Sequence, residues 1–328
     1  MVSQIFLAAP GSVPAVGTDT TAIPTAQPSG QWLPYSTSTP GPDVLTIQYM
    51  TNASRTGIYF YDGTKSPAIQ GKTGNPIYLI RSVGHTGMSR RQVDAMVTPD
   101  VIVPNLKAAI AGSKDVKLHG SIGALGYDYV AETPAGTGVG AVRNTAYESG
   151  TNNVTGVWAG GKVDIKAPSK AVGTPNTLAS QTGFYTGPWD ALNMTQAEFY
   201  NWVGPPQDDA KGKAPLPSGI VYLSKPGEKP GMGKHKFVFD GGSGDGLLYV
   251  NGDLEIQGDF TYRGLIYVEG DVKIKGTGWI LGGLILGDKS NLSQSHKETL
   301  TVLKSNEAIS TFLNNHKTPF LTLGWRES

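Results

Sequence analysis

Apolar and polar positions repeat with a six-residue period in the segment that begins at Leu248. Each unit has the form apolar-x-apolar-x-Gly-x, and the glycines in phase are Gly252, Gly258, Gly264, Gly270, Gly276 and Gly282. Residues two apart point to the same side of an extended chain, so both apolar positions of a unit face one core. A glycine at each sixth position lets the chain turn a corner. Such a repeat is typical of a solenoid.

Three of these units make a coil of about 18 residues, and such coils stack about 4.8 Å apart through strand ladders. The segment Leu248–Gly258 is similar to Ile266–Gly276, which begins 18 residues later, as stacked coils require. Weaker copies of the pattern occupy 110–127 and 157–174. We therefore predict about four coils. An ordinary glycine-rich β-sandwich is the alternative. The solenoid would span 106–297, with excursions at 128–156 and 175–247.

Shorter patterns outside the repeat predict an antiparallel sheet. Leu45–Tyr49 alternates apolar and polar residues, and Ile77–Val83 and Arg91–Val97 are β-prone runs on either side of Gly84–Gly87. The two runs predict a hairpin with one buried face. Further strands are expected at Leu300–Leu303 and Phe320–Leu323. We expect this sheet to be built from 44–105 and 298–328.

Two short helices and one irregular arm complete the prediction. Thr195 and Glu198 form a capping box that begins a helix ending at Gly204. A second helix is predicted from Asn306 to Asn315, and residues 1–43 form a Pro/Gly-rich arm. The predicted fold class is therefore mainly β: an antiparallel sheet with an inserted short β-solenoid and one or two short helices.

Composition agrees with a β-rich chain and excludes several classes of function. There are 44 Gly and 22 Pro among 328 residues, and only 16% of residues are charged. The chain has no Cys, which excludes disulfides, thiolate metal sites and a cysteine nucleophile. The formal net charge of +1 gives no global field that would attract nucleic acid or a membrane surface. No apolar run approaches the roughly 18 residues of a membrane span.

Three segments resemble the extracellular part of PilX-type minor pilins of the type IV pilus. Tyr78–Val97 is similar to the hairpin that follows the pilin stem in that family. Leu248–Asp271 is similar to the Gly-Asp repeats in the solenoid of its larger members. Leu323–Glu327 resembles their C-terminal Trp-Arg-Glu sequence. The chain therefore resembles a large form of these pilins with an inserted β-solenoid.

The resemblance implies a non-enzymatic protein at the cell surface that helps to assemble the pilus tip and presents a surface for adhesion. Its partners would be other minor pilins or pilus-tip proteins, and it would need no cofactor. Minor pilins begin with a prepilin-peptidase site and a long apolar helix, and neither is found here. Either this segment was removed from the chain or the chain is a soluble relative that cannot join a pilus. We favour removal, so that membrane anchoring would need a native N-terminal helix.

Motifs for catalysis or metal binding do not stand out. The five His are scattered without metal-ligand spacing, and neither H-E-x-x-H nor G-x-S-x-G occurs. Four carboxylates lie near the repeat: Asp245, Asp253, Asp259 and Asp271. Asp253 and Asp271 are one coil apart, and paired acids are what a polysaccharide-active enzyme would need. Each follows a corner glycine, where Asp commonly accepts backbone N–H bonds, so a turn role is favoured.

One basic stretch is the candidate contact for a polyanion. Its cationic residues are Lys225, Lys229, Lys234, His235 and Lys236. They could touch DNA phosphates or an acidic polysaccharide, with Tyr222 and Phe237 as stacking faces. The alternative is a solvated hairpin tip, because Pro-Gly occurs twice and favours turns.

Three other functions stay open on the sequence alone. The chain could be a DNA-binding pilus-tip protein in DNA uptake, or a polysaccharide-binding or polysaccharide-active β-helix protein. It could also be a bactofilin-like filament protein whose solenoid polymerises end to end.

Overall fold

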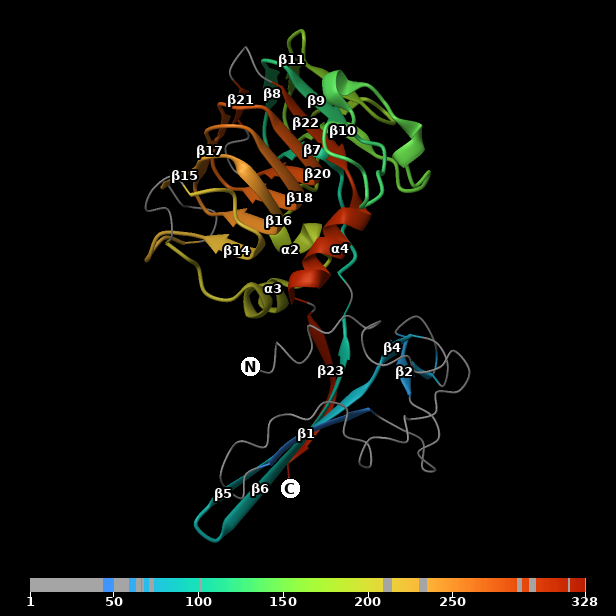
Figure 1. Ribbon diagram of the computed structural model, residues 1–328, viewed down its shortest axis with the longest axis vertical. Coiled ribbons are helices and arrows are strands. Elements are labelled where there is room, and N and C mark those ends of the chain that lie inside the picture. The colour runs from blue at the N-terminus through green and yellow to red at the C-terminus, as the bar shows by residue number, and fades with distance from the viewer. Residues whose placement is uncertain are drawn as a thin grey trace. The chain divides into compact units, whose positions relative to one another are not determined.

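The computed structural model describes residues 44–49, 59–62, 66, 68–70, 74–100, 102–208, 214–229, 235–287, 291–294, 299–317 and 319–327. It divides into two units, and the second interrupts the first in the chain. Met1–Val101 and Thr318–Ser328 make the unit that we call the antiparallel unit, and Ile102–Lys317 make the parallel unit. Figure 1 labels the elements of both. The fold is mainly β with a few short helices.

The antiparallel unit contains a four-stranded sheet in the order β1-β5-β6-β23. Its strands are β1 (Val44–Tyr49), β5 (Tyr78–Thr86), β6 (Ser89–Pro99) and β23 (Phe320–Glu327). Every pairing in it is antiparallel. A second, smaller sheet has the order β3-β2-β4, with β2 at Phe60–Tyr61, β3 at Ile69–Gln70 and β4 at Asn75–Pro76.

The predicted hairpin is present, but its turn lies further along the chain than Gly84–Gly87. Thr86 pairs with Ser89, so the turn consists of Gly87 and Met88. Gly87 has a φ of 61°, the left-handed conformation that two-residue hairpin turns require and glycine adopts easily. The strands are therefore longer than the β-prone runs.

Three strands of the parallel unit pair in parallel with an 18-residue step. β16 (Gly242–Val250), β18 (Phe260–Val268) and β20 (Gly278–Leu286) lie side by side. Leu248 is opposite Ile266, and Ile266 is opposite Leu284. A second sheet runs through β17 (Asp253–Ile256), β19 (Val272–Ile274) and β21 (Asn291–Gln294). The six-residue pattern thus sets the register of pairing that the sequence predicted.

The order of strands in space differs from their order in the chain. β7 (Ala108–Gly112), β8 (Val116–His119) and β9 (Ile122–Leu125) pair on one side with β20, β21 and β22 (Leu300–Lys304). On the other side they pair with β10 (Thr155–Ala159), β11 (Val163–Ile165) and β12 (Lys170–Val172). Strands from the end of the parallel unit, β20 to β22, therefore lie beside strands from its beginning, β7 to β9 (Figure 1).

Two predicted boundaries are wrong. β22 pairs in parallel with β20 and β9 and buries Leu300 and Val302 in their core, so 299–317 belong to the parallel unit and not to the antiparallel sheet. The excursion predicted at 175–247 is shorter, because it contains β13 (Thr177–Leu178), β14 (Gly219–Leu223) and β15 (Lys236–Phe239). β14 and β15 pair with β16 and β17, and Gly219 of β14 is opposite Gly246.

Glycines allow adjacent strands of the parallel unit to lie close together. Gly246, Gly264 and Gly282 are opposite one another in adjacent strands, and all three have positive φ. A Cβ at Gly264 would lie 2.1 Å from the carbonyl oxygen of Gly246. No other residue type fits this position without displacing the backbone.

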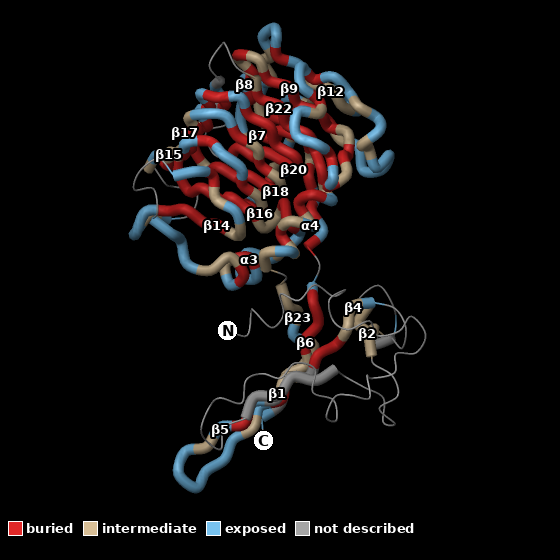
Figure 2. The backbone as a smooth tube through the Cα atoms, viewed as in Figure 1, coloured by how far each residue is buried: buried red, intermediate tan, exposed pale blue. Residues whose placement is uncertain are grey.

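Helices cover an outward-facing row of side chains on the parallel unit. Each residue of the row is in register with the next one on the neighbouring strand. The row consists of Tyr222, Tyr249, Tyr267, Ile285, Ala111 and Trp158. α2 (Pro188–Ala191), α3 (Gln196–Val203) and α4 (Asn306–Lys317) pack against it, and the capping box of α3 is present. Side chains therefore pack on both sides of these strands, which Figure 2 shows as buried.

The excursion after β9 covers a second outward surface. Arg263 donates hydrogen bonds to the carbonyl oxygens of Ala131 and Thr133, and the indole N–H of Trp279 donates to that of Thr137. Two 3₁₀ turns, Val139–Ala141 and Thr145–Tyr147, lie in this segment. None of the helices among the described residues is long and apolar enough to cross a membrane.

Candidate functional site

The basic stretch begins after β14 with a loop whose described part ends at Lys229, and its last residue, Lys236, is the first residue of β15. The side chains of Lys225 and Lys229 are exposed, whereas Lys234 lies outside the described residues. The buried amide of Asn251 donates to the carbonyl oxygen of Lys229 and to the hydroxyl of Ser224, and so holds the base of the loop.

The other two residues of the stretch make contacts within the sheet. His235 is half-buried, and its ring packs edge-on against Phe237 at 4.9 Å. Lys236 Nζ lies 3.1 Å from Glu255 Oε2, and Lys275 bonds the other oxygen of the same carboxylate. These bonds, with one from Gln257, lower the pKa of Glu255 to about 2, Lys275 contributing most. Lys236 of β15 and Lys275, which follows β19, thus both pair with Glu255 of β17.

Neither proposed stacking face is available to a ligand. Tyr222 is buried and stacks on Tyr249 with ring centroids 4.6 Å apart. Phe237 has no exposed surface and belongs to the core between the sheets. Both aromatic residues are structural, so the suggestion that they stack on nucleic-acid bases is wrong.

The carboxylates near the repeat serve mainly as corner acceptors. Asp253 Oδ1 accepts from the backbone N–H of Asp271 at 2.9 Å, and Asp259 Oδ1 accepts from that of Thr277 at 2.7 Å. Asp245 pairs with His316 of α4 at 2.9 Å. Over the described part of the chain, no group of three or more His, Asp or Glu residues could hold a metal ion.

A buried ion pair joins the first excursion to the start of α4. Lys304 has no exposed surface, and its ammonium lies 2.9 Å from Asp128 Oδ1. It also donates to the carbonyl oxygen of Asn152, and Asp128 accepts from the backbone N–H of Asn306. Burial lowers the pKa of Lys304. Every charge here is matched, so the pair is structural.

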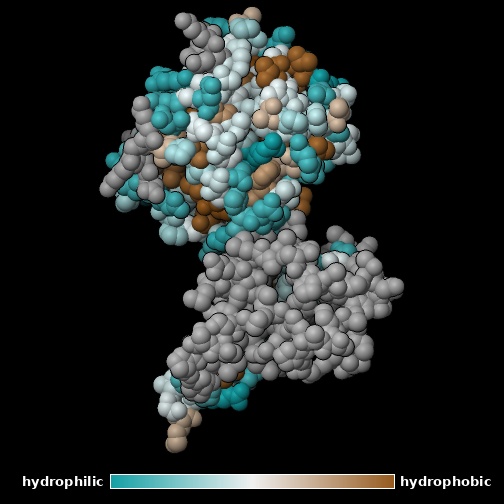
Figure 3. Space-filling view, viewed as in Figure 1, coloured by the Kyte–Doolittle hydropathy of each residue, from teal (hydrophilic) through white to brown (hydrophobic). Residues whose placement is uncertain are grey.

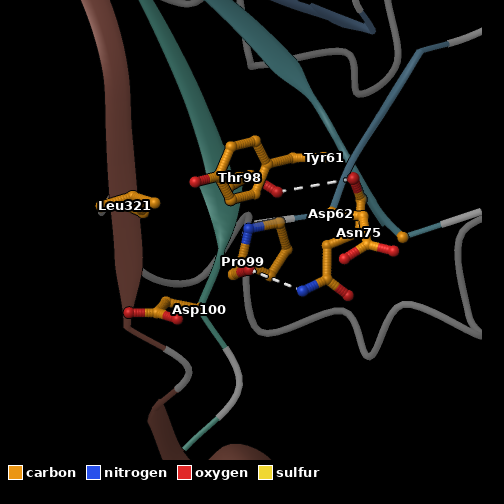
Figure 4. Close-up of a pocket in the computed structure, with 8 residues that line it drawn as sticks. Tyr61, Asp62, Asn75, Thr98, Pro99, Asp100 and Leu321 are labelled. Carbon is orange, nitrogen blue, oxygen red and sulfur yellow. Dashed lines mark hydrogen bonds between the residues drawn. The ribbon is translucent and has the colours of Figure 1, made fainter. Parts of the chain in front are cut away.

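The antiparallel unit has a polar pocket of about 520 Å³, drawn in Figure 4. Asn75 donates to the carbonyl oxygen of Pro99, and the Thr98 hydroxyl donates to that of Pro76 at 3.1 Å. The rest of the described lining is Tyr61, Asp62, Gly74, Asp100 and Leu321. Its side chains mainly tie β4 to β6.

A second polar pocket, of about 250 Å³, lies on the parallel unit beside β7 and α2. We call it the Lys107 pocket; it is lined by Asn105, Lys107, Gly183, Phe184, Tyr185, Asp190, Asn193 and Met194. Three separate segments contribute to it, and none carries a motif. Sequence reasoning therefore missed it.

Polar side chains predominate on the visible surface of the parallel unit, with smaller apolar patches between them (Figure 3).

Tyr185 forms the centre of this pocket. Its hydroxyl accepts from the backbone N–H of Lys107 at 2.6 Å and donates to the carbonyl oxygen of Asn105 at 3.0 Å. Burial raises the pKa of Tyr185, so the hydroxyl stays protonated. The Lys107 ammonium lies 5.4 Å from the centre of the Tyr185 ring and 5.8 Å from that of Trp158.

Comparisons with known proteins give little to add. No family model matches the chain. No curated protein matches it either. The chain is similar to the crystal structure of the competence-associated pilin ComZ from Thermus thermophilus, with 13% sequence identity, a TM-score of 0.20 and 87% of each chain covered. This TM-score is far below the values found for two proteins that share a fold. The likeness therefore supports no conclusion about fold or function.

Proposed function

We propose that this chain is the exposed, non-enzymatic domain of a type IV pilus minor pilin of the PilX type, acting at the cell surface in pilus-tip assembly and adhesion. The supporting observation is that two of the segments with pilin resemblance are neighbours in one sheet. Trp325 of the C-terminal segment is opposite Ala95 of the hairpin, and Glu327 is opposite Val93. Segments far apart in sequence thus share one structural element.

In this proposal the parallel unit is a short β-solenoid that serves as a rigid spacer. Rigidity follows from ladders that run through every coil and from side chains packed on both sides of the strands. Recognition would then fall to the segments that leave the coils, because loops on a rigid scaffold commonly carry binding residues. The partners would be other minor pilins or pilus-tip proteins.

The first test is the N-terminus of the native protein. Surface material would be sheared from the native organism, and the protein isolated for intact mass and N-terminal sequencing. The proposal expects an additional apolar segment with an N-methylated first residue, and co-purification with other pilins. A native chain that begins at Met1 and stays in the soluble fraction would overturn it.

The basic loop supports a second candidate, contact with DNA or another polyanion. Lys225 and Lys229 are exposed, and neither takes part in an ion pair with a described residue. Replacing Lys225, Lys229, Lys234 and Lys236 by Ala should weaken binding to duplex DNA and reduce its dependence on salt, because fewer counterions are released. Unchanged binding would show that the loop is a turn only.

A further inference from the structure

We propose that the Lys107 pocket binds one carboxylate-bearing sugar residue, such as a uronic acid unit of an acidic glycan. The proposal does not depend on assembly into a pilus. It rests on the charge, the hydrogen-bonding groups, the wall and the size of the pocket.

Lys107 supplies a positive charge that forms no ion pair with a described carboxylate. Its side chain is half-buried, and its ammonium is held over the rings of Trp158 and Tyr185. Among the described residues it makes no ion pair and no side-chain hydrogen bond. A cation placed over aromatic faces keeps its charge and its donors for a ligand. The group that it fits is an anion.

The rim supplies neutral donors and acceptors. The carboxamides of Asn105 and Asn193 are exposed and have no partner among the described side chains and backbone. Asp190 Oδ2 is used by the backbone N–H and the hydroxyl of Thr186, which leaves Oδ1 as an acceptor. A ligand with several hydroxyls would match this set, because each hydroxyl can both donate and accept.

One wall of this mainly polar pocket contributes a small apolar surface from Phe184 and Met194. Phe184 is half-buried and packs against Trp158 at 5.5 Å and against Tyr185 at 5.2 Å. Met194 adds an apolar side chain to the lining. A pyranose ring has one face of C–H groups, which an aromatic or thioether wall can contact while the hydroxyls bind at the rim.

Size and charge favour a single carboxylated ring over a phosphate polymer. The volume of about 250 Å³ is below the range of roughly 300–1,000 Å³ that accommodates drug-sized ligands. Only one cation lines the pocket, and Asp190 lies in the same lining. A phosphate dianion or a nucleic-acid strand would need several cations. A carboxylate monoanion needs one.

The test compares a charged with an uncharged sugar on the whole purified chain. Glucuronate, galacturonate and glucose would be titrated by saturation-transfer NMR and calorimetry. We expect at least one of the two uronates to bind about tenfold or more tightly than glucose, the range of a hydrogen bond to a charged group. Equal affinities for uronates and glucose, or no binding of either uronate, would overturn the proposal.

Matched variants assign the effect to the pocket. Lys107→Met keeps an unbranched stem over the aromatic rings but removes the charge, and should abolish the preference for the uronate. Asn193 has a φ of 56°, which glycine adopts readily, so Asn193→Gly removes only the side-chain amide. This variant should bind both the uronates and glucose more weakly. Lys170→Met, an exposed lysine of β12, is the control. If Lys107→Met folds, by near-ultraviolet circular dichroism, and retains the preference, the assignment is wrong.

Discussion

The two units use β-strands in opposite ways. Every residue of β20 in the parallel unit is buried, whereas β6 in the antiparallel unit begins with three exposed residues, and Met88 before it is fully exposed. Strands such as β20 carry core side chains on one side and covering segments on the other. The hairpin end relies mainly on its backbone ladder. Replacing the same type of residue should therefore lower the free energy of unfolding much more in the parallel unit than in the antiparallel unit.

The largest difference is expected between two glycines. In Gly264→Ala the new Cβ would lie 2.1 Å from a backbone oxygen at a φ of 133°, so we expect a loss of about 4 kcal/mol or more in the free energy of unfolding. In Gly84→Ala the Cβ meets nothing within 4 Å, and the change should stay within about 0.5 kcal/mol. Urea denaturation with hydrogen exchange resolved by peptide would measure both. Similar losses at the two sites would contradict the comparison.

The next difference concerns ion pairs. Lys304→Met leaves the Asp128 carboxylate buried without its ammonium partner, which should cost about 3 kcal/mol. Arg91→Met breaks an ion pair with Glu327 whose side chains are 79% and 43% exposed, and should cost less than about 1 kcal/mol. Adding Asp128→Asn to Lys304→Met should recover part of the loss, as a double-mutant cycle in urea would show. A cost at Arg91 equal to that at Lys304 would refute this account.

A smaller effect is expected on the pH dependence of stability. The pKa of Glu255 is lowered from 4.5 to about 2 in the folded chain, so its ion pairs contribute fully above pH 4.5. That contribution is lost as the pH falls from 4.5 toward 2, because the unfolded carboxylate takes up a proton first. Glu255→Gln should flatten the profile of unfolding free energy in this window. Glu327→Gln, at the exposed pair, is the matched control. Identical slopes for Glu255→Gln and the parent chain would be the contrary result.

The smallest effect is expected at an exposed aromatic residue of the antiparallel unit. Trp325 on β23 is 71% exposed, so Trp325→Thr should change the free energy of unfolding by no more than about 0.5 kcal/mol. Thermal and urea unfolding would measure it. A loss above about 2 kcal/mol would mean that this side chain is packed, and the contrast between the units would narrow.

Local repetition made part of the fold predictable. The six-residue pattern gave the pairing of Leu248 with Ile266 and of Ile266 with Leu284, because a periodic sequence fixes which residues stack. The helix from Thr195 and the helix from Asn306 were also predicted, since a capping box and an apolar stripe are local signals.

What depends on distant segments was not predictable. The six-residue period does not predict that β22 lies between β20 and β9, because it does not specify which strands pair at the ends of the repeat. β14 and β15 were missed because they lie 27 and 17 residues before the strands they pair with, and not 18. The Lys107 pocket combines residues near 105, 184 and 193, whose proximity follows only from the tertiary structure. The basic loop was visible in sequence, but the bond from Lys236 to Glu255 was not.

The parallel unit is inserted between two adjacent strands of the antiparallel sheet, β6 and β23. Pro99 is opposite Phe320, and the backbone N–H of Asp100 donates to the carbonyl oxygen of Pro319. The chain therefore leaves and re-enters the antiparallel sheet at one closed rung, where a short turn could equally join the two strands. Replacing the whole insert by a short turn at this rung would leave the register of the antiparallel sheet unchanged.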